Sequence, residues 1–427
     1  MPTILTIAFL VLLALGVPIA FSIALGSVVA IIVDGRLPLT LVPQRTIAGA
    51  DAFSLLAVPM FILVGNLMNI GGVTDKIINL ANALVGRFRG GLAQSSIVSA
   101  VIFSGVSGSA VSEAAALGKI LVPAMKKQGY SGAFSAAVVS AACINGPIMP
   151  PSVPLIVYAV SVGVAGVTVE KMFMAGIVPS IVYSLGLILV TYMLARRNNF
   201  PVSMAVPLSR FPAILVAALP AVFMFIFIRI SVSLGIATVT ESAAVAVGLA
   251  LLIGVAYGNL NLRNLPNIFM QSALETAIVL IIVATSAVFA WLATVSGFAR
   301  IGADLILAIS DNPAVVIFMI VLFLLALGTF MDGLPAMLIL IPVLLPVAQQ
   351  IGMDLTQFGM VLVFGLMLGL LTPPVGLLLF ITGAFAGVTM GQQFRAILPY
   401  LAVGAITLTL IAFIPGLSLW LPQWLGM

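Results

Sequence analysis

The sequence predicts an all-α polytopic membrane protein built as an inverted repeat, with two re-entrant hairpins and two broken transmembrane helices. Its composition and a passage that occurs twice are the observations that predict this fold. Of the 427 residues, 63% are hydrophobic and only 6% are charged, whereas a soluble protein carries roughly 25% charged residues. A helix of about 20 apolar residues can cross a bilayer. Several long stretches lack Asp, Glu, Lys and Arg, among them 1–33, 90–112, 128–169, 276–299, 355–394 and 396–427.

The repeated passage begins at Gly105 and ends at Pro151, and it recurs without a gap 223 positions later. Under this shift Gly105 meets Gly328, and the pair Pro150-Pro151 meets Pro373-Pro374. Glycine and proline break helices, and here they do so inside apolar sequence. Two copies of a broken apolar unit in one chain are typical of the binding site of a secondary transporter.

Ordinary spans follow from hydropathy alone. They are predicted at about 4–33, 53–70, 175–195, 212–230, 238–257, 276–296 and 397–416. Residues 36–50 and 262–275 mix charged and apolar positions between these spans. We expect both segments to be helices that lie along the membrane surface.

Four regions do not fit simple crossings. Residues 92–125 and 314–348 each hold two apolar arms, too short to span, around a polar centre with glycine, which predicts a re-entrant hairpin. Residues 134–165 and 358–387 carry Gly-x-x-x-Pro-Pro near the middle, which should unwind a helix there. The chain is therefore predicted to be one transmembrane domain. Its parts are repeat 1 over about 4–195, a linking span over about 212–230 and repeat 2 over about 238–416.

Charge predicts the orientation, because basic residues gather in cytoplasmic loops. With the base of the first hairpin inside, ten basic residues fall inside: Lys76, Arg87, Arg89, Lys126, Lys127, Arg196, Arg197, Arg210, Arg263 and Arg395. Five fall outside: Arg36, Arg45, Lys171, Arg229 and Arg300, the last expected to be an interfacial anchor. This places the N-terminus in the cytoplasm and the C-terminus, with its Trp420 and Trp424 belt, in the periplasm. Five crossings separate the hairpins, so the second copy is predicted to be upside down.

Several function classes are excluded by composition. Histidine is absent, which excludes His-ligated zinc, Ser-His triads and His proton relays. The net charge of +5 comes without a basic tail or stripe, so nucleic acid is not an expected partner. The single Cys143 lies in an apolar run and is expected to be a packing residue. No nucleophile and base pair is evident, so the protein is not expected to be an enzyme.

The hairpin tips and the broken helices offer oxygen atoms that could bind a cation. The first tip contains four serines and two glycines, which permit a tight turn and bring hydroxyls, and the proline-rich break opposite it frees backbone carbonyls. Such a cage suits a small hard cation, and we expect one Na⁺ site in each repeat. The first is predicted from Ser104, Ser107, Gly108, Ser109, Asn145, Gly146 and Pro147. The second is predicted from Gly328, Thr329, Asp332, Gly369, Thr372 and Pro373.

Simpler explanations stand beside these. Serine and glycine in membrane helices often serve close packing, although two clusters at a matched offset, each followed by Pro-Pro, favour a site. Asp332 could equally cap the second arm of its hairpin. Glu113 and Lys119 are expected to pair or to reach the membrane surface rather than to contact substrate.

These motifs resemble a known family. The Ser-Gly-Val-Ser-Gly-Ser tip, the Asn-Gly-Pro-Ile-Met-Pro-Pro-Ser break and the Gly-Leu-Leu-Thr-Pro-Pro-Val-Gly break are similar to those of the large, DctM-like subunit of tripartite ATP-independent periplasmic (TRAP) transporters. The resemblance covers essentially the whole chain. It implies a sodium-driven importer of the bacterial inner membrane. It also implies an elevator-like movement of residues 92–165 and 314–387 against a scaffold.

The resemblance implies partners and a substrate as well. The partners are a periplasmic binding protein that delivers an organic acid and a small four-helix membrane subunit, expected here as a separate chain. The acid is a sialic acid or a C4-dicarboxylate, and the tips are similar to those of sialic-acid members. It would lie between the tips, met by helix N-termini and hydroxyls. The residues expected to bind it are Ser107, Ser109, Pro150, Asp332 and Thr372.

Two rival functions remain open. One is a standalone sodium symporter for divalent anions, which has the same hairpins but needs no binding protein. The other is a channel or ion antiporter, which is expected to carry a charged pore ring or an acidic pair within one span. Only Asp332 fits that description, so the sequence favours a transporter.

Overall fold

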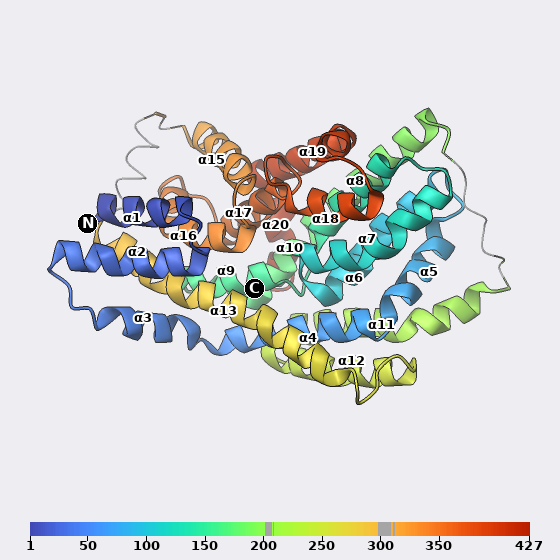
Figure 1. The fold of residues 1–427 in the computed structure, drawn as a ribbon, viewed down its shortest axis with the longest axis horizontal. Helices are drawn as coiled ribbons and strands as arrows, with labels where there is room; N and C mark the ends of the chain where they lie inside the picture. Colours follow the sequence, from blue (N-terminus) through green and yellow to red (C-terminus); the bar gives the residue numbers. More distant parts are fainter. Residues whose placement is uncertain (201–206, 208, 298–308, 311) are drawn as a thin grey trace.

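The computed structural model describes residues 1–427 apart from 201–206, 208, 298–308 and 311. The described chain folds into helices, and none of its residues is in a strand (Figure 1). The first half contains α1 (Pro2–Ala14), α2 (Ile19–Asp34), α3 (Leu41–Ala50), the 3₁₀ turn η1 (Phe53–Leu56), α4 (Ala57–Ile70), α5 (Val73–Val85), α6 (Gly91–Ser107), α7 (Ala110–Lys127), α8 (Gly132–Ala142), η2 (Cys143–Asn145), α9 (Val153–Val162) and α10 (Val169–Arg197). The second half contains α11 (Phe211–Ser233), α12 (Val239–Ala256), α13 (Leu265–Val295), α15 (Pro313–Gly328), α16 (Gly333–Gln350), α17 (Leu355–Gly369), α18 (Leu377–Ala386), α19 (Met390–Phe413) and α20 (Gly416–Trp424).

Seven helical segments of the described chain are long and apolar enough to cross a membrane. Six of them, η1 with α4, α10, α11, α12, α13 and α19, coincide with predicted spans. The seventh is α16, the second arm of the second hairpin, with 18 residues. The prediction that every hairpin arm is too short to cross is therefore wrong for this arm, because its length suffices. Together these segments make the chain a multi-pass membrane protein.

The predicted first span, 4–33, is wrong. The chain forms two packed helices instead, α1 and α2, and the N-terminal nitrogen of Met1 lies 3.9 Å from an Asp34 carboxylate oxygen. The reason is local: Gly16 has a φ of +80°, and Pro18 follows it at the N-cap of α2. Proline biases the preceding residue away from the helical region, so one continuous helix cannot form. Met1 and Arg36 consequently lie near the same end of this helix pair and cannot be on opposite sides of a membrane that both helices cross.

The boundary predicted between a surface segment, 262–275, and a span, 276–296, is also absent. Both lie in the single helix α13, whose 31 residues begin at Leu265. The segment predicted at 36–50 does form a separate short helix, α3, and it packs along the C-terminal half of α13. Two further helices, α5 and α20, occur where the sequence predicted none.

Both predicted hairpins are present as pairs of helices joined by a short tip. In the first, α6 ends at Ser107 and α7 begins at Ala110. In the second, α15 ends at Gly328 and α16 begins at Gly333. Both tips fall at the polar Ser/Gly and Thr/Asp centres. There glycine permits the tight turn, and side-chain oxygens can bond the backbone groups that the helix ends leave without partners.

Both predicted broken helices are present as well. In the first repeat, α8 and η2 end at Asn145, and α9 resumes at Val153. In the second, α17 ends at Gly369 and α18 resumes at Leu377. Each break contains a cis Pro-Pro bond, at Pro150-Pro151 and at Pro373-Pro374. The two breaks therefore match in backbone as well as in sequence.

The two halves are related as an inverted repeat. In α10 and its counterpart α19, Gly186 lies beside Val403 and the Thr191 hydroxyl lies 3.1 Å from that of Tyr400, so the helices run antiparallel. The α3–α4 segment likewise runs antiparallel to α13. Packing is also reciprocal, since α7 contacts α18 and α16 contacts α9. A two-fold axis perpendicular to the helices produces this pattern, which is the geometry of inverted-topology transporters.

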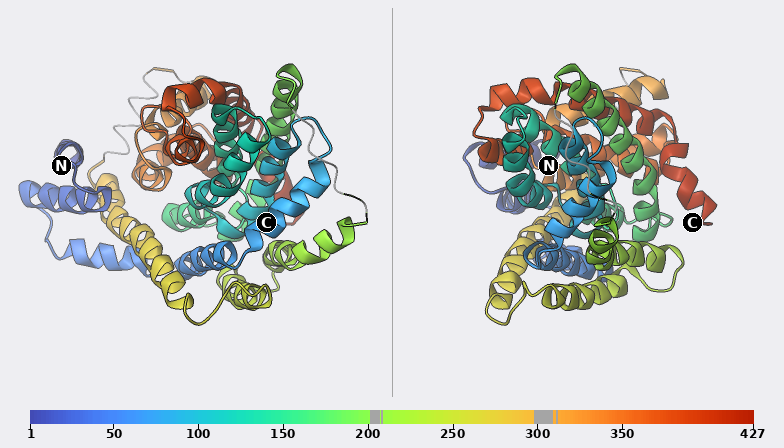
Figure 2. Two further views of the ribbon diagram at one scale, coloured as in Figure 1. Left: turned by 45° about the vertical axis from the view of Figure 1, so that its right-hand side comes forward. Right: turned by 90° about the vertical axis from the view of Figure 1, so that its right-hand side faces the viewer.

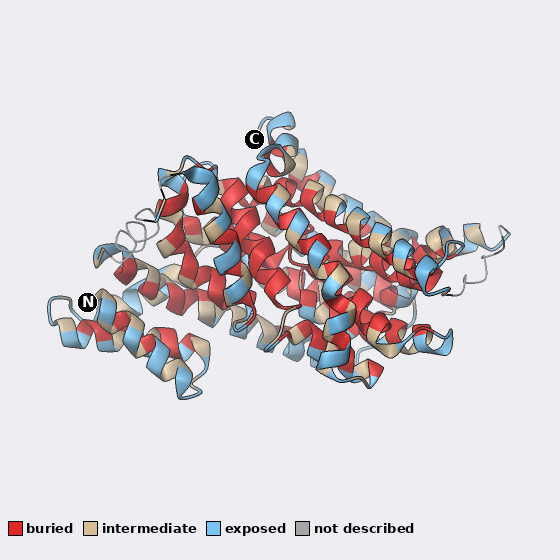
Figure 3. Cartoon of the chain, turned by 90° about the horizontal axis from the view of Figure 1, so that it is seen from above, coloured by how far each residue is buried: buried red, intermediate tan, exposed pale blue. Residues whose placement is uncertain are grey.

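Buried residues concentrate in the middle of the molecule (Figure 3), and the broken helices are the most completely buried elements. Every residue of α17 from Thr356 to Gly369 is buried, as is every residue of α8 from Phe134 to Ala142. A helix that is apolar on all sides is stable in a protein core or inside a membrane, and the burial of α8 and α17 places both in the protein core. By contrast, α1 and α2 stand out at one end of the molecule, joined to the rest by α3 and α13 (Figure 2).

Cys143 is buried and free, in agreement with a packing role. Trp420 and Trp424 lie exposed on the terminal helix α20, with their rings stacked at 6.5 Å. Arg300 lies outside the described residues.

Candidate functional site

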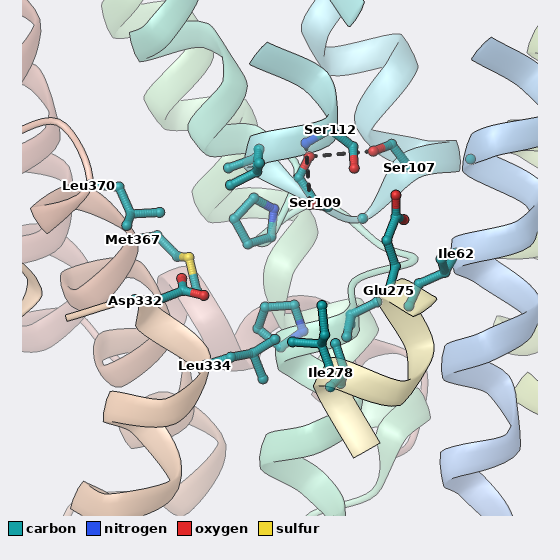
Figure 4. A pocket seen from close by; sticks show the side chains of 18 of the residues that line it. Ile62, Ser107, Ser109, Ser112, Glu275, Ile278, Asp332, Leu334, Met367 and Leu370 are labelled. Atoms are coloured by element: carbon teal, nitrogen blue, oxygen red, sulfur yellow. Dashed lines mark hydrogen bonds between the residues drawn. The ribbon is translucent and has the colours of Figure 1, made fainter. Parts of the chain in front are cut away.

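The two hairpin tips face one cavity of about 350 Å³ (Figure 4). Helices α4 and α13 form its other wall, and apolar residues such as Ile62, Ile278, Leu334 and Leu370 cover much of its surface. Pockets for small organic ligands typically have volumes of roughly 300–1,000 Å³. The polar side chains of the described lining are Asn66, Ser107, Ser109, Ser112, Glu275 and Asp332.

The first tip is a tight turn closed by its own serines. Gly108 adopts a left-handed φ of +61°, and Ser109 is the N-cap of α7. The Ser112 amide donates to the Ser109 hydroxyl at 3.4 Å, and the Ser107 hydroxyl donates to the Ser109 carbonyl at 3.4 Å. This arrangement leaves the N-terminus of α7, with its positive dipole end, at the cavity wall.

Glu113 lies behind this tip, against the first break. The residue is completely buried, and neither carboxylate oxygen has a hydrogen-bond partner among the described residues. A Cβ atom on Gly146 would lie 2.7 Å from Oε1 of Glu113 and 3.0 Å from the carbonyl carbon of Ser109. Only glycine permits so close an approach of break and tip.

The expected pairing or snorkelling of Glu113 is therefore wrong. Lys119 is exposed on the same arm, and no ion pair joins the two residues. Burying an unpaired carboxylate is costly, so such a group requires a compensating cation or a proton. The sequence signal was available: Glu113 is the first acid after a long uncharged run, just beyond the tip.

Asn145, in the first break, makes contacts other than those expected. Its side-chain oxygen accepts hydrogen bonds from Ser180 at 2.7 Å and from Ser184 at 3.1 Å, both on α10. Its amide nitrogen donates to the Ala142 carbonyl at 3.0 Å. The amide thus ties the break to α10, and both lone pairs of the oxygen have partners.

The second tip and break enclose a smaller cavity of about 130 Å³. Gly328, Thr329 and Asp332 line it, together with the backbone turn at Val375 and Gly376. The Val375 amide donates to the Thr329 carbonyl at 3.3 Å, which joins break and tip. Asp332 occupies the N-cap position of α16 but makes no capping hydrogen bond with its side chain. The cap interpretation is therefore not supported, and the carboxylate lines both cavities.

The structure brings only some of the predicted residues to a cavity. Ser104 donates to the Val101 carbonyl within its own helix, and the Pro150 carbonyl accepts two hydrogen bonds from Arg229 of α11. Thr372 does not line either cavity. The predicted residues at a cavity are Ser107, Gly108, Ser109, Pro147, Gly328, Thr329 and Asp332.

Two cavity residues come from helices that the sequence analysis left aside. Asn66 of α4 donates to Ser272 at 3.0 Å and to a Glu275 oxygen at 3.1 Å. The other Glu275 oxygen accepts from Gln271 at 3.0 Å. Both positions were missed because Glu275 closes a segment that was assigned to the membrane surface and Asn66 lies in an otherwise ordinary span.

A family model described as the DctM component of tripartite ATP-independent periplasmic transporters matches residues 6–417. An uncharacterised protein of Salmonella typhimurium, YgiK, is 38% identical over 97% of this chain and 95% of its own. The sialic acid TRAP transporter large permease protein SiaM of Vibrio cholerae is 35% identical over 96% of each chain. The C4-dicarboxylate TRAP transporter large permease protein DctM of Pseudomonas aeruginosa is 34% identical over 88% of each.

The fold also resembles a solved structure. The YdaH transporter of Alcanivorax borkumensis superimposes with a TM-score of 0.62 over 91% of this chain and 88% of that one. Its sequence is only 17% identical. At that level the similarity concerns the fold alone, which is that of a helical polytopic membrane protein.

Proposed function

The chain belongs to the DctM component family of tripartite ATP-independent periplasmic transporters, and from that premise we propose that it imports an organic acid driven by a sodium gradient. The family consists of transport permeases, so the protein is a secondary transporter of the bacterial membrane and not an enzyme. The observation that carries the proposal is the convergence of two tips and two breaks on adjoining cavities, with one carboxylate at each tip.

The first sodium ion would bind between the first tip and the first break. Glu113 supplies an unpaired buried carboxylate there, and the backbone of the break at Gly146 packs closely against it. Sodium is coordinated in such transporters by unwound carbonyls and helix C-terminal ends. An ion at this place would neutralise Glu113, which otherwise has no partner in the described chain. We therefore add Glu113 to the ligands expected from the sequence and assign Asn145 a supporting role.

The second ion would bind in the smaller cavity between the second tip and break. Thr329 offers a hydroxyl and a carbonyl, and Asp332 offers a carboxylate. The described chain holds no cluster of three or more acidic, Cys or His residues. A site with one carboxylate and neutral oxygens suits a monovalent cation better than a divalent one, because the net negative charge is small.

The organic acid would occupy the larger cavity. Its carboxylate would meet the N-terminus of α7 and the hydroxyls of Ser107 and Ser109. Asp332 lines both cavities, so the substrate and the second ion would share one wall. The shared wall supports coupled binding of sodium and substrate, because each ligand would help to hold Asp332 in the position that the other ligand needs.

An elevator movement would carry the hairpins and the broken helices together as one unit against a scaffold, with the hairpins re-entrant in the membrane. Hydrogen bonds support a larger unit than 92–165 and 314–387. Tyr183 of α10 donates to Ala141, and Gln393 of α19 donates to Thr382. We therefore include α10 and α19 in the moving unit and assign α1–α5 and α11–α13 to the scaffold.

The orientation keeps the base of the first hairpin in the cytoplasm, as the distribution of basic residues favours. The C-terminus would then lie in the periplasm. The N-terminus, expected in the cytoplasm, would instead share the periplasmic side with Arg36, because α1 and α2 return the chain to the side from which it starts. Labelling of a cysteine introduced beside Met1 by a membrane-impermeant maleimide on whole spheroplasts tests this, and labelling only after lysis would contradict it.

The expected partners are a periplasmic binding protein and a small four-helix membrane subunit. The alternative is a symporter for divalent anions that works without a binding protein. Family membership favours the tripartite system. Uptake into proteoliposomes that contain this chain and the small subunit distinguishes the two possibilities.

The experiment compares four conditions: with and without a sodium gradient, and with and without loaded binding protein. We expect uptake only when both are present. Uptake without the binding protein would support the alternative, and uptake that ignores sodium would contradict the proposed driving force.

A further inference from the structure

The larger cavity has an unusual charge for a site that receives an organic acid. Two of its polar side chains, Glu275 and Asp332, are carboxylates, and its described lining contains no Lys or Arg. In Figure 4 they approach from different sides, Asp332 from the start of α16 and Glu275 from α13 toward Ser107. The carboxylate of the substrate must therefore bind at the tip serines, and the acidic side chains then lie beside the remaining part of the substrate.

The two carboxylates are not equivalent. Asp332 also lines the smaller cavity, where the proposed sodium ion would offset its charge. Glu275 lies in the larger cavity only. Hence neither proposed ion lies beside the Glu275 carboxylate, and the substrate would meet that carboxylate directly.

Hydrogen bonds hold Glu275 in place. One oxygen accepts from Asn66 at 3.1 Å, and the other accepts from Gln271 at 3.0 Å. A carboxylate offers about four acceptor positions, so about two remain for a ligand. The group can accept hydrogen bonds from substrate hydroxyls but cannot donate any while it is ionised.

We propose that the cavity selects monocarboxylates that carry several hydroxyl groups, and that Glu275 is the residue that accepts those hydroxyls and rejects dicarboxylates. This inference rests on the proposed function of the cavity. A dicarboxylate would place its second negative charge near Glu275, and like charges in a partly desolvated cavity repel. A hydroxylated monocarboxylate places donors there instead, and hydrogen bonds to charged acceptors are the stronger kind.

The test measures binding to the purified complex of this chain with its small membrane subunit, without the binding protein, because that protein has a selectivity of its own. N-acetylneuraminate and gluconate serve as hydroxylated monocarboxylates, and succinate and fumarate serve as dicarboxylates. Calorimetric titrations in sodium chloride and in choline chloride give the sodium dependence of each. We expect at least one hydroxylated acid to bind more tightly than both dicarboxylates in sodium.

The variant Glu275→Gln keeps the size of the side chain and removes the charge. We expect the affinity for the hydroxylated acid to fall about tenfold, the effect of losing hydrogen bonds to a charged group, while dicarboxylate binding stays equal or improves. Glu275→Asp, which keeps the charge, should preserve the preference. Glu170→Gln, in the first turn of α10 and outside the cavity, is the matched control and should change neither affinity.

The outcomes distinguish a failure of the proposed selectivity from a failure of the proposed function. Equal or tighter dicarboxylate binding in the wild type, or an equal loss for both ligand classes in Glu275→Gln, overturns the selectivity assigned here and leaves sodium-coupled transport intact. If no organic acid binds in a sodium-dependent way, the proposed function itself fails. A ratio of affinities is informative because a merely structural effect of the substitution would weaken both classes alike.

Discussion

Arg229 of α11 donates two hydrogen bonds to the carbonyl of Pro150, from Nε at 3.2 Å and from Nη2 at 2.8 Å. Its guanidinium also lies over the Phe225 ring at 3.6 Å. The contact joins a scaffold helix to the first break. Under an elevator mechanism it exists in this conformation and must break when the hairpin unit moves.

The first prediction follows from that contact. Arg229→Gln should lower the occupancy of this conformation, because a charge-assisted hydrogen bond to the moving unit is lost. A cysteine introduced at Ser112, in the cavity, reports the change as an altered rate of maleimide labelling. Arg210→Gln, at the exposed start of the same helix, is the control. Identical labelling rates in the wild type, in Arg229→Gln and in Arg210→Gln would show that the Arg229 contact does not bias the conformation.

Glu113 gives the second prediction. Glu113→Gln keeps the shape of the side chain but removes the charge, so we expect sodium affinity to fall at least about tenfold. Sodium that binds the folded state raises the melting temperature of the wild-type complex, and the variant should lose most of this increase. A full sodium-dependent increase in Glu113→Gln would mean that the buried acid is not a ligand. Glu170→Gln should behave as the wild type.

The third prediction concerns the close approach of tip and break at Gly108. Its φ is +61°, and a Cβ there would lie 2.8 Å from the Pro151 carbonyl oxygen. Gly352 has a similar φ of +71° but nothing within 4 Å. Gly352→Ala should therefore cost about 1 kcal/mol for the left-handed backbone alone. Gly108→Ala should cost more, because the tip must also shift, and thermal unfolding of the two variants measures the difference. Equal losses would contradict the close contact.

The sequence predicted the tips and breaks well, because Gly, Pro and Ser act on the backbone locally. Ser109 caps α7, and Pro150-Pro151 interrupts the first broken helix. Both effects act within a few residues of the chain and do not depend on which helices pack nearby. Gly16 and Pro18 interrupt the helix between α1 and α2 in the same way, but the apolar run on either side of them also fits one long span, and that interpretation was wrong.

Side-chain roles were predicted less well, because they depend on residues distant in sequence. Asn145 is in the expected place, but Ser180 and Ser184 occupy its oxygen. Glu275 enters the cavity only because α13 is one continuous helix beside Asn66. No local pattern distinguishes these cases, since each depends on how two helices pack.

The division into moving unit and scaffold gives the last prediction. A Cβ on Gly65 of α4 would lie 3.8 Å from the Ser107 Cβ, within the range of roughly 3.5–4.5 Å that a disulfide needs. The double variant Gly65→Cys with Ser107→Cys should therefore cross-link scaffold and tip on oxidation. We expect uptake to stop in the oxidised protein and to return on reduction, because the bond prevents the movement.

The matched control lies within the proposed moving unit. A Cβ on Gly186 of α10 would lie 3.8 Å from the Val403 Cβ of α19. Oxidation of Gly186→Cys with Val403→Cys should leave uptake at the level of its reduced form, because these helices travel together. Inhibition by this second bond would assign α10 and α19 to different units, and undiminished uptake across the first bond would rule out a sliding movement at that interface. Comparing each variant with its own reduced form removes the effect of the substitutions themselves, including that of Ser107 in the cavity.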